Sequence, residues 1–390
     1  MSEEKRLKFI WRCLCTVGRP FLKHKFAFHY EKNNLSCPSL IIANHVTSWD
    51  PMLLAITFPK NHLHFVASDH IFRWGKISKI IEWLVAPVAR RKGASGSHTA
   101  MECMRLLREG RSVCIFGEGE VTWDGRSQAI APGTGSLAKS AGAALITYRF
   151  DGGALTRPRW SSSIRKGKMT GKVIRVYTPD ELAHMSTEEI GVAINRDLYT
   201  DAFEEQKKNP IAFRGKNLAE HIEASLFLCP KCKKIGNLKS EGNYLRCSCG
   251  LELEYTPQCS FSPEKPFTNY QEWDDWQHQA LQKNEFQHDD VLFSDDDVLW
   301  FEIKDGEKPL QDRVKLWIDR DGIFHCGDQS VSMHRISNMA MVQANKLFFS
   351  VGPQYFELKS DQQVVNFRKY LAAWKIFKDE RMDENGLFRR

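Results

Sequence analysis

The chain has 390 residues, which is more than one ordinary domain contains and favours two or three structural units. With 42% hydrophobic and 26% charged residues it can bury a sizeable core, which excludes a disordered or fibrous protein. The formal charge of +7 is concentrated in residues 5–25 and 157–175, each with seven basic and no acidic side chains. Both stretches favour an anionic partner, namely lipid headgroups, a phosphorylated substrate or nucleic acid.

The longest nearly uncharged apolar stretch covers residues 80–89. It is about half of the roughly twenty residues that a helix needs to cross a bilayer, so we expect no membrane-spanning helix. Near the N-terminus, Arg12 and Arg19 interrupt the one candidate secretory signal. We therefore expect a cytoplasmic protein with eleven reduced cysteines.

The N-terminal region, residues 1–30, begins with an amphipathic pattern. Leu7, Ile10, Trp11 and Leu14 follow helical spacing, and basic side chains lie on the other side. Such a helix can lie in a membrane interface, or it can simply pack on the domain behind it. We expect the membrane contact.

Strand-like and helical patterns alternate from residue 40 to about 178, which is typical of an α/β layer with a mostly parallel sheet. A capping box at Ser186 and Glu189 predicts a further helix to about residue 206, and we expect the catalytic domain to span 31–215. The expected strands are 40–43, 63–67, 85–89, 112–116, 144–150 and 172–177, and the expected helices are 51–58, 70–83, 97–109 and 133–142.

The strongest local signal lies in residues 41–51, where an apolar strand leads into a polar turn. Asp50 followed by Pro51 is typical of a helix start, so the turn is predicted at the end of a strand, where α/β proteins build sites. His45 and Asp50 can meet across this turn. The carboxylate would orient the imidazole, whose other nitrogen could then take a proton from a hydroxyl. Alternatively, Asp50 only caps the helix and His45 is an ordinary loop histidine.

Asn44 and His45, followed by Asp50, resemble the His-x4-Asp block of the glycerolipid acyltransferases, which include 1-acylglycerol-3-phosphate acyltransferase. Residues 113–119, which end in Glu118 and Gly119, resemble that family's Phe-Pro-Glu-Gly-Thr-Arg block. Two other segments are similar to the second and the last block, namely Arg90–Arg91 and residues 144–149. The resemblance covers about residues 35–205.

The resemblance implies a glycerol-phosphate-acyltransferase-like α/β fold and direct acyl transfer to a glycerol hydroxyl of a lysophospholipid. The expected donor is acyl-CoA or acyl-carrier protein, and the expected acceptor is 1-acylglycerol-3-phosphate, which gives phosphatidic acid. His45 would be the general base and Asp50 its orienting carboxylate. The residues implied in substrate binding are Asn44, Arg90, Arg91, Glu118, Gly119, Arg126 and Arg149.

The chain departs from the family pattern at two positions of the third block. Gly117 replaces a proline, and Val121 replaces the arginine thought to grip the acceptor's phosphate. Valine cannot make the charge-assisted hydrogen bonds of a guanidinium. Phosphate binding would then fall to Arg126, to Arg90 or Arg91, to Arg149, or to the basic stretch 157–175.

Residues 220–260 contain two short cysteine pairs, Cys229 with Cys232 and Cys247 with Cys249, separated by fourteen residues. Four thiolates brought to one ion without an open position predict a structural zinc ribbon. Free thiols or disulfides are the alternatives. Because zinc ribbons also occur in nucleic-acid proteins, a nucleic-acid or protein-binding adaptor on a decayed acyltransferase domain is the rival function. No interleaved aromatic platform for bases accompanies the ribbon, so nucleic acid is not expected.

Short alternating runs follow a Trp-rich helical stretch and end in a helical pattern at 364–377. They predict a small β-rich domain over 285–380, which resembles the pleckstrin-homology-like barrel. We expect a peripheral enzyme at the inner face of a membrane, held by its basic N-terminal helix and basic surface. The helical stretch is 268–283, and the expected strands are 291–293, 298–303, 314–318, 322–326, 339–343, 346–351 and 354–358.

Overall fold

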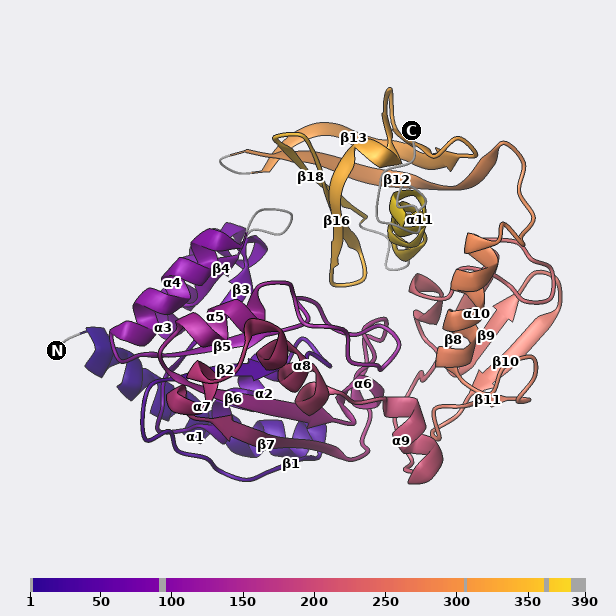
Figure 1. The fold of residues 1–390 in the computed structure, drawn as a ribbon. Coiled ribbons are helices and arrows are strands. Elements are labelled where there is room, and N and C mark those ends of the chain that lie inside the picture. Colours follow the sequence, from indigo (N-terminus) through magenta and orange to yellow (C-terminus); the bar gives the residue numbers. More distant parts are fainter. Residues whose placement is uncertain (1–2, 91–95, 305–306, 361–364, 380–390) are drawn as a thin grey trace. The chain divides into compact units, whose positions relative to one another are not determined.

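The computed structural model describes residues 3–90, 96–304, 307–360 and 365–379 (Figure 1). The chain forms two compact units. The first consists of residues 1–159 and 164–215, and the second consists of residues 160–163 and 216–390.

The first unit is built on a seven-stranded sheet of order β1-β7-β6-β2-β5-β3-β4 (Figure 1). Five of its neighbouring pairs are parallel and the β6–β7 pair is antiparallel, which confirms the expected α/β layer with a mostly parallel sheet. The strands are β1 (Phe28–Tyr30), β2 (Ser39–Ala43), β3 (Leu63–Ser68), β4 (Val88–Arg90), β5 (Ser112–Phe116), β6 (Ala144–Asp151) and β7 (Met169–Tyr177).

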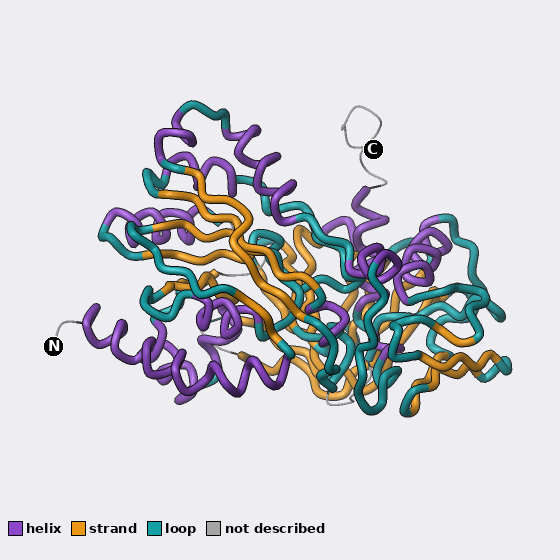
Figure 2. The backbone as a smooth tube through the Cα atoms, turned by 90° about the horizontal axis from the view of Figure 1, so that it is seen from below, coloured by secondary structure: helices purple, strands orange, loops and turns teal. Residues whose placement is uncertain are grey.

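Helices lie along the outside of this sheet (Figure 2). All five residues of β2 are buried, as expected of a central strand covered on both faces. One core cluster joins Leu40 and Ile42 of β2 to apolar side chains of the covering helices, such as Leu106 and Ile190. The helices are α1 (Glu3–Phe26), α2 (Asp50–Thr57), η1 (Asp69–Arg73), α3 (Lys76–Val85), α4 (Ser97–Arg108), α5 (Thr134–Ser140), α6 (Gly153–Thr156), α7 (Pro179–Ala183), α8 (Thr187–Leu198) and α9 (Ala202–Lys208).

Two predicted elements differ in extent. The capping box is confirmed, because Ser186 Oγ accepts the Glu189 N–H at 3.1 Å and Glu189 Oε2 accepts the Ser186 N–H at 2.7 Å. The helix that it opens does not run to residue 206, because Asp201 accepts two backbone N–H groups and starts α9 separately. The strand expected at 85–89 is shorter, since Val85 still belongs to α3.

The N-terminal helix α1 forms as predicted, and two of the four residues of its apolar stripe are buried against the protein. Leu7 and Trp11 are each 2% exposed, and Trp11 Nε1 donates to the Phe58 carbonyl oxygen at 2.9 Å. The domain thus covers the Leu7 and Trp11 side of the stripe, whereas Leu14 stays 44% exposed, so contact of this helix with a membrane stays a prediction. Among the described residues, none of the helices combines the length and the apolar character needed to cross a membrane.

The second unit contains a four-stranded sheet, order β11-β10-β9-β8, and a seven-stranded antiparallel sheet, order β15-β14-β13-β12-β18-β17-β16. A helix at the end of the chain accompanies the larger sheet, which confirms the β-rich domain with a final helix. Its elements are η2 (Ile222–Ala224), β8 (Leu238–Glu241), β9 (Tyr244–Cys247), β10 (Leu251–Tyr255), β11 (Phe261–Ser262), α10 (Tyr270–Gln282), β12 (Val291–Ile303), β13 (Glu307–Asp319), β14 (Ile323–Cys326), β15 (Gln329–Ser332), η3 (Met333–Arg335), β16 (Ile336–Val342), β17 (Lys346–Val351), β18 (Gln354–Lys359) and α11 (Arg368–Asp379).

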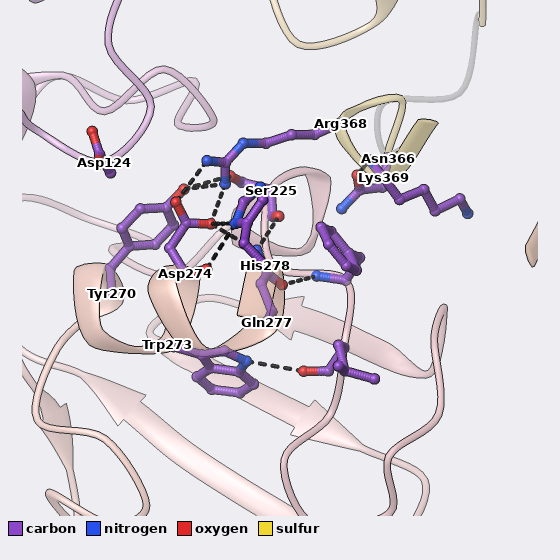
Figure 3. A network of polar contacts seen from close by, with 12 residues as sticks. Asp124, Ser225, Tyr270, Trp273, Asp274, Gln277, His278, Asn366, Arg368 and Lys369 are labelled. Carbon is purple, nitrogen blue, oxygen red and sulfur yellow. Dashed lines mark hydrogen bonds and ion pairs between the residues drawn. The ribbon is translucent and has the colours of Figure 1, made fainter. Parts of the chain in front are cut away.

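A buried ion pair joins α11 to α10 (Figure 3). Arg368 Nη2 donates to Asp274 Oδ2 at 2.6 Å, and Arg368 Nη1 also reaches the Ser225 hydroxyl. Burial alone would raise the pKa of the Asp274 carboxyl, but the charge of Arg368 beside it lowers that pKa. On the same helix, Gln277 Oε1 accepts the Phe227 N–H at 2.9 Å. The segment that leads to Cys229 is thereby fixed to the helices of the second unit.

Candidate active site

The turn at residues 44–49 is tied to the neighbouring strand β6. Asn44 is fully buried, and its side-chain amide donates to the Phe150 carbonyl oxygen at 2.9 Å while its Oδ1 accepts the Phe150 N–H at 2.7 Å. Both polar ends of the Asn44 side chain are thus bonded to β6. The structure places this predicted substrate-binding residue beneath the turn, where it determines the turn's position.

His45 and Asp50 meet across the turn, as the spacing predicts. His45 Nδ1 lies 2.8 Å from Asp50 Oδ2, which also accepts the backbone N–H groups of Val46 at 2.7 Å and Thr47 at 3.0 Å. Asp50 is the first residue of α2, and no side-chain hydrogen bond caps that helix. The alternative in which Asp50 serves only as a helix cap is therefore wrong, because its carboxylate points back into the turn.

This contact favours one tautomer of the His45 imidazole. The Asp50 carboxylate can only accept, so Nδ1–H donates to it, and the tautomer leaves Nε2 as the free base. Burial raises the pKa of Asp50, and the three donors on Oδ2 oppose that rise. The His45 side chain is 17% exposed and its ring stacks on Phe116 at 4.3 Å between centroids. The Nε2 edge can therefore meet a substrate while the ring plane stays fixed.

Glu118 connects the turn to the end of β5. Strands β2 and β5 are parallel, with Ala43 opposite Phe116, so the residues after them emerge at the same edge of the sheet. Glu118 Oε1 accepts the His45 N–H and Oε2 accepts the Gln128 N–H, both at 3.1 Å. Burial raises the pKa of Glu118 to about 8. Gly119, the next residue, is exposed and has a φ of +75°, a left-handed conformation that favours glycine.

The predicted phosphate-binding arginines are dispersed. Arg126 pairs with Asp124 at 3.2 Å and with Asp201 at 3.3 Å. Arg149 pairs with Asp151 at 3.1 Å. Arg90 ends β4, which is three positions away from β2 in the sheet, and Arg91 lies outside the described residues.

Arg159 fills the loop in which the family arginine is missing, and the sequence reasoning did not single it out. Its Nη1 donates to the Val121 carbonyl oxygen at 2.6 Å and pairs with Glu120 Oε2 at 2.9 Å. The guanidinium also lies 4.2 Å from the ring centroid of Trp123, and the side chain is 5% exposed. In the sequence, the one indication of a role for Arg159 is its place in the basic stretch 157–175. A count of charges does not distinguish a paired arginine from an available one.

The four cysteines of the second unit come together in a second cluster. Their Sγ atoms all lie within 4.8 Å of one another, and the Cys229–Cys249 and Cys232–Cys247 sulfurs are each 3.7 Å apart. A zinc ion about 2.3 Å from four tetrahedral sulfurs would separate them by about 3.8 Å. A disulfide would need about 2.05 Å. The cluster can therefore hold a metal ion in the expected geometry.

Comparison with known proteins finds a family model and a similar solved structure. Residues 25–151 match the family model described as Acyltransferase, a match that includes His45, Asp50 and Glu118 and ends with the last residue of β6. Among solved structures, the chain is similar to the 1-acyl-sn-glycerophosphate (LPA) acyltransferase PlsC from Thermotoga maritima. The identity is 16% and the TM-score 0.44, over 53% of this chain and 83% of that one. The family model thus bears out the resemblance for residues 25–151, which match an acyltransferase domain.

Proposed function

We propose that this protein is a glycerolipid O-acyltransferase that acylates a free glycerol hydroxyl of a lysophospholipid, with 1-acylglycerol-3-phosphate as the acceptor. The observation that carries the proposal is the His45–Asp50 contact of 2.8 Å inside the acyltransferase domain. A thioester, either acyl-CoA or acyl-carrier protein, is the donor.

The reaction needs one base and no acyl-enzyme. His45 Nε2 takes the proton of the acceptor hydroxyl as its oxygen attacks the thioester carbonyl carbon, and the C–S bond then breaks. The imidazolium returns the proton to the leaving thiolate, while the Asp50 carboxylate stabilises the positive charge between these steps. Cys114 in β5 is no rival nucleophile, because burial raises the pKa of its thiol well above the ordinary value.

We assign the other predicted residues by their contacts. Asn44 and Glu118 are positioning residues, since one bonds β6 and the other bonds the His45 N–H. Gly119 is exposed beside Glu118, where backbone can approach a substrate. Arg126 and Arg149 are already paired with carboxylates, so we assign Arg126 to the stability of its loop and Arg149 to that of β6.

We propose zinc as the ion of the cysteine cluster. All four sulfurs lie near tetrahedral distances, so Cys229, Cys232, Cys247 and Cys249 would complete the coordination of Zn²⁺. Such an ion supplies folding free energy to a segment too small to hold its own core. The seven strands and closing helix of the adjacent region support a pleckstrin-homology-like domain over 285–380.

A membrane surface remains the proposed partner, but through different residues. Helix α3 exposes Ile77, Ile80 and Trp83, each more than half, and its one buried side chain is Ser78. Lys76 and Lys79 are exposed on the same helix. An apolar face flanked by bases matches the interface of an anionic bilayer. Helix α1 adds Phe9, Val17 and Phe21, which are exposed on its outer side.

An acyl-transfer assay tests the proposed function. Purified protein receives a panel of lysophospholipids with acyl-CoA or acyl-carrier protein, and both free thiol and acylated product are measured. Product must require both substrates and disappear in His45→Ala, whereas His29→Ala, which changes an exposed histidine of β1, should behave like the wild type. The rival adaptor would show no transfer and would bind nucleic acid with a steep dependence on salt.

A further inference from the structure

Arg157 lies against the exposed side of the catalytic turn. It follows α6, where its backbone N–H donates to the Gly153 carbonyl oxygen at 2.9 Å. Its Nη1 donates to the hydroxyl of Ser48, an exposed residue between His45 and Asp50. Its Nε is enclosed by protein without an acceptor. Nη1 of Arg157 thus lies at the surface of the turn, beside Ser48, which is three residues along the chain from His45.

This placement is rigid, because the segment before Arg157 is packed on the turn. A Cβ atom added to Gly153 would come within 2.3 Å of Val46 Cγ2, so α6 and the turn approach as closely as glycine allows. Phe150 is held by both ends of the Asn44 amide. The backbone that leads to Arg157 is therefore held by the same contacts that hold the turn, and Ser48 orients its guanidinium.

Arg157 also differs in charge balance from the arginines near the site. Arg126, Arg149 and Arg159 each pair with a carboxylate. Within the described part of the chain, no carboxylate pairs with Arg157, and burial lowers its pKa. Removing a guanidinium from water without an anion costs free energy that a bound anion would recover.

We propose that Arg157, oriented by the Ser48 hydroxyl, binds the phosphate monoester of a substrate and takes over the role of the arginine replaced by Val121. Its paired terminal nitrogens match phosphate oxygens in a fork that neither valine nor the occupied Arg159 can offer. This inference rests on the proposed function for its substrate. The phosphate can come from the acceptor's glycerol 3-phosphate or from the 3′-phosphate of CoA.

Arg90 is the competing candidate, because it ends a strand at the same edge of the sheet. Three strand spacings separate β4 from β2, which is about 14 Å at about 4.8 Å each. A phosphate held by Arg90 would thus lie much farther from His45 than one beside Ser48. Arg90→Gln accordingly belongs in the experiment.

Steady-state kinetics of Arg157→Gln and Arg157→Lys test the inference with 1-acylglycerol-3-phosphate, with monoacylglycerol and with acyl-CoA varied in turn. We expect kcat/KM for the phosphorylated acceptor to fall about 10- to 100-fold in Arg157→Gln, the usual range for a lost charge-assisted contact. Transfer to monoacylglycerol and the KM for acyl-CoA should stay within twofold. If instead the KM for acyl-CoA rises, the phosphate belongs to the donor. Unchanged values for both substrates, or losses confined to Arg90→Gln, would overturn the assignment.

Calorimetric titration separates this inference from the proposed function. Glycerol 3-phosphate and CoA are titrated into wild-type protein, Arg157→Gln, and Arg175→Gln, a control that changes an exposed arginine paired with Glu181. If binding depends on Arg157 but the protein has no transferase activity, the phosphate site is supported and the proposed acyltransferase function is rejected. Equal affinities in wild type and Arg157→Gln would reject the site. The unfolding midpoint of each variant shows whether it is folded. If Arg157→Gln does not fold, Arg157→Lys, which keeps the charge, is titrated in its place.

Discussion

The catalytic turn of the first unit and the cysteine cluster of the second are both compact groups of polar side chains, but they are held together differently. In the turn, Asp50 Oδ2 accepts three hydrogen bonds and Glu118 adds two more. In the cluster, four sulfurs face one another within 4.8 Å. Protein hydrogen bonds alone thus order the first group, whereas a bound ion would order the second. A change in the turn should affect chemistry, and a change in the cluster should affect folding.

The first expected effect is on the rate. His45→Ala removes the base and should lower kcat by about 10²- to 10⁴-fold, the usual contribution of general-base catalysis. The unfolding midpoint should fall only modestly, because the variant loses the Asp50 contact and the Phe116 stacking but keeps the two backbone donors on Asp50 Oδ2. Stopped product formation in a protein with unchanged circular dichroism is the expected result. A near wild-type rate would contradict the mechanism.

Removal of the metal should show the opposite pattern. Cys232→Ser, or treatment with a strong chelator, should abolish bound zinc and the cooperative unfolding of the second unit, since a structural zinc contributes about 10–16 kcal/mol of binding free energy. Metal analysis and differential scanning calorimetry measure both. Cys13→Ser, at an exposed cysteine of α1, is the control. Wild-type protein purified without chelator and found free of zinc would reject the assignment.

The next prediction tests whether the first unit contacts a membrane through α3. Ile80→Glu or Trp83→Glu should weaken binding to anionic vesicles about tenfold or more, because each removes about 1.5–3 kcal/mol of apolar burial. Val192→Glu, which changes an exposed apolar residue of α8, is the matched control. Sedimentation with vesicles measures the effect, and equal losses in all three variants would contradict a specific role for α3.

The last prediction concerns Glu118 and pH. Its folded pKa of about 8 lies above the unfolded value of about 4.3, so the folded state binds the extra proton between these values. Stability from this group is therefore full below pH 4 and decreases as pH rises to about 8, by at most about 1.4 kcal/mol per unit. Glu118→Gln should flatten that decrease in melts from pH 5 to 8. Glu31→Gln, at an exposed carboxyl, should not, and identical slopes in all three proteins would reject the raised pKa.

Short-range patterns predicted much of the site. The five-residue spacing of His45 and Asp50 required a turn between them, and the 2.8 Å contact follows from that turn. The cysteine pairs likewise predicted a cluster, because each pair closes its own short loop. The alternation of strands and helices predicted the parallel sheet, since each crossover needs a covering helix.

The pairing of charges could not be predicted in this way. Arg126 is occupied by Asp201, which is 75 residues away, and Arg159 is occupied by Glu120 across 39 residues. Such partners depend on which distant segments the fold brings together. A count of charges along the sequence therefore cannot tell which arginines are paired. The sequence also could not show which surface covers the apolar stripe of α1. Its amphipathic pattern is compatible with burial against protein or against lipid.

The hydrogen bonds between Asn44 and Phe150 connect residues 106 positions apart. Contacts of such sequence separation form late, because the intervening chain must first be ordered. A growing polypeptide that has exposed His45 and Asp50 but not yet β6 lacks the support beneath the turn. Under the proposed function, activity therefore depends on completion of the sheet, and an incomplete chain released early would carry His45 and Asp50 without the strand that supports their turn.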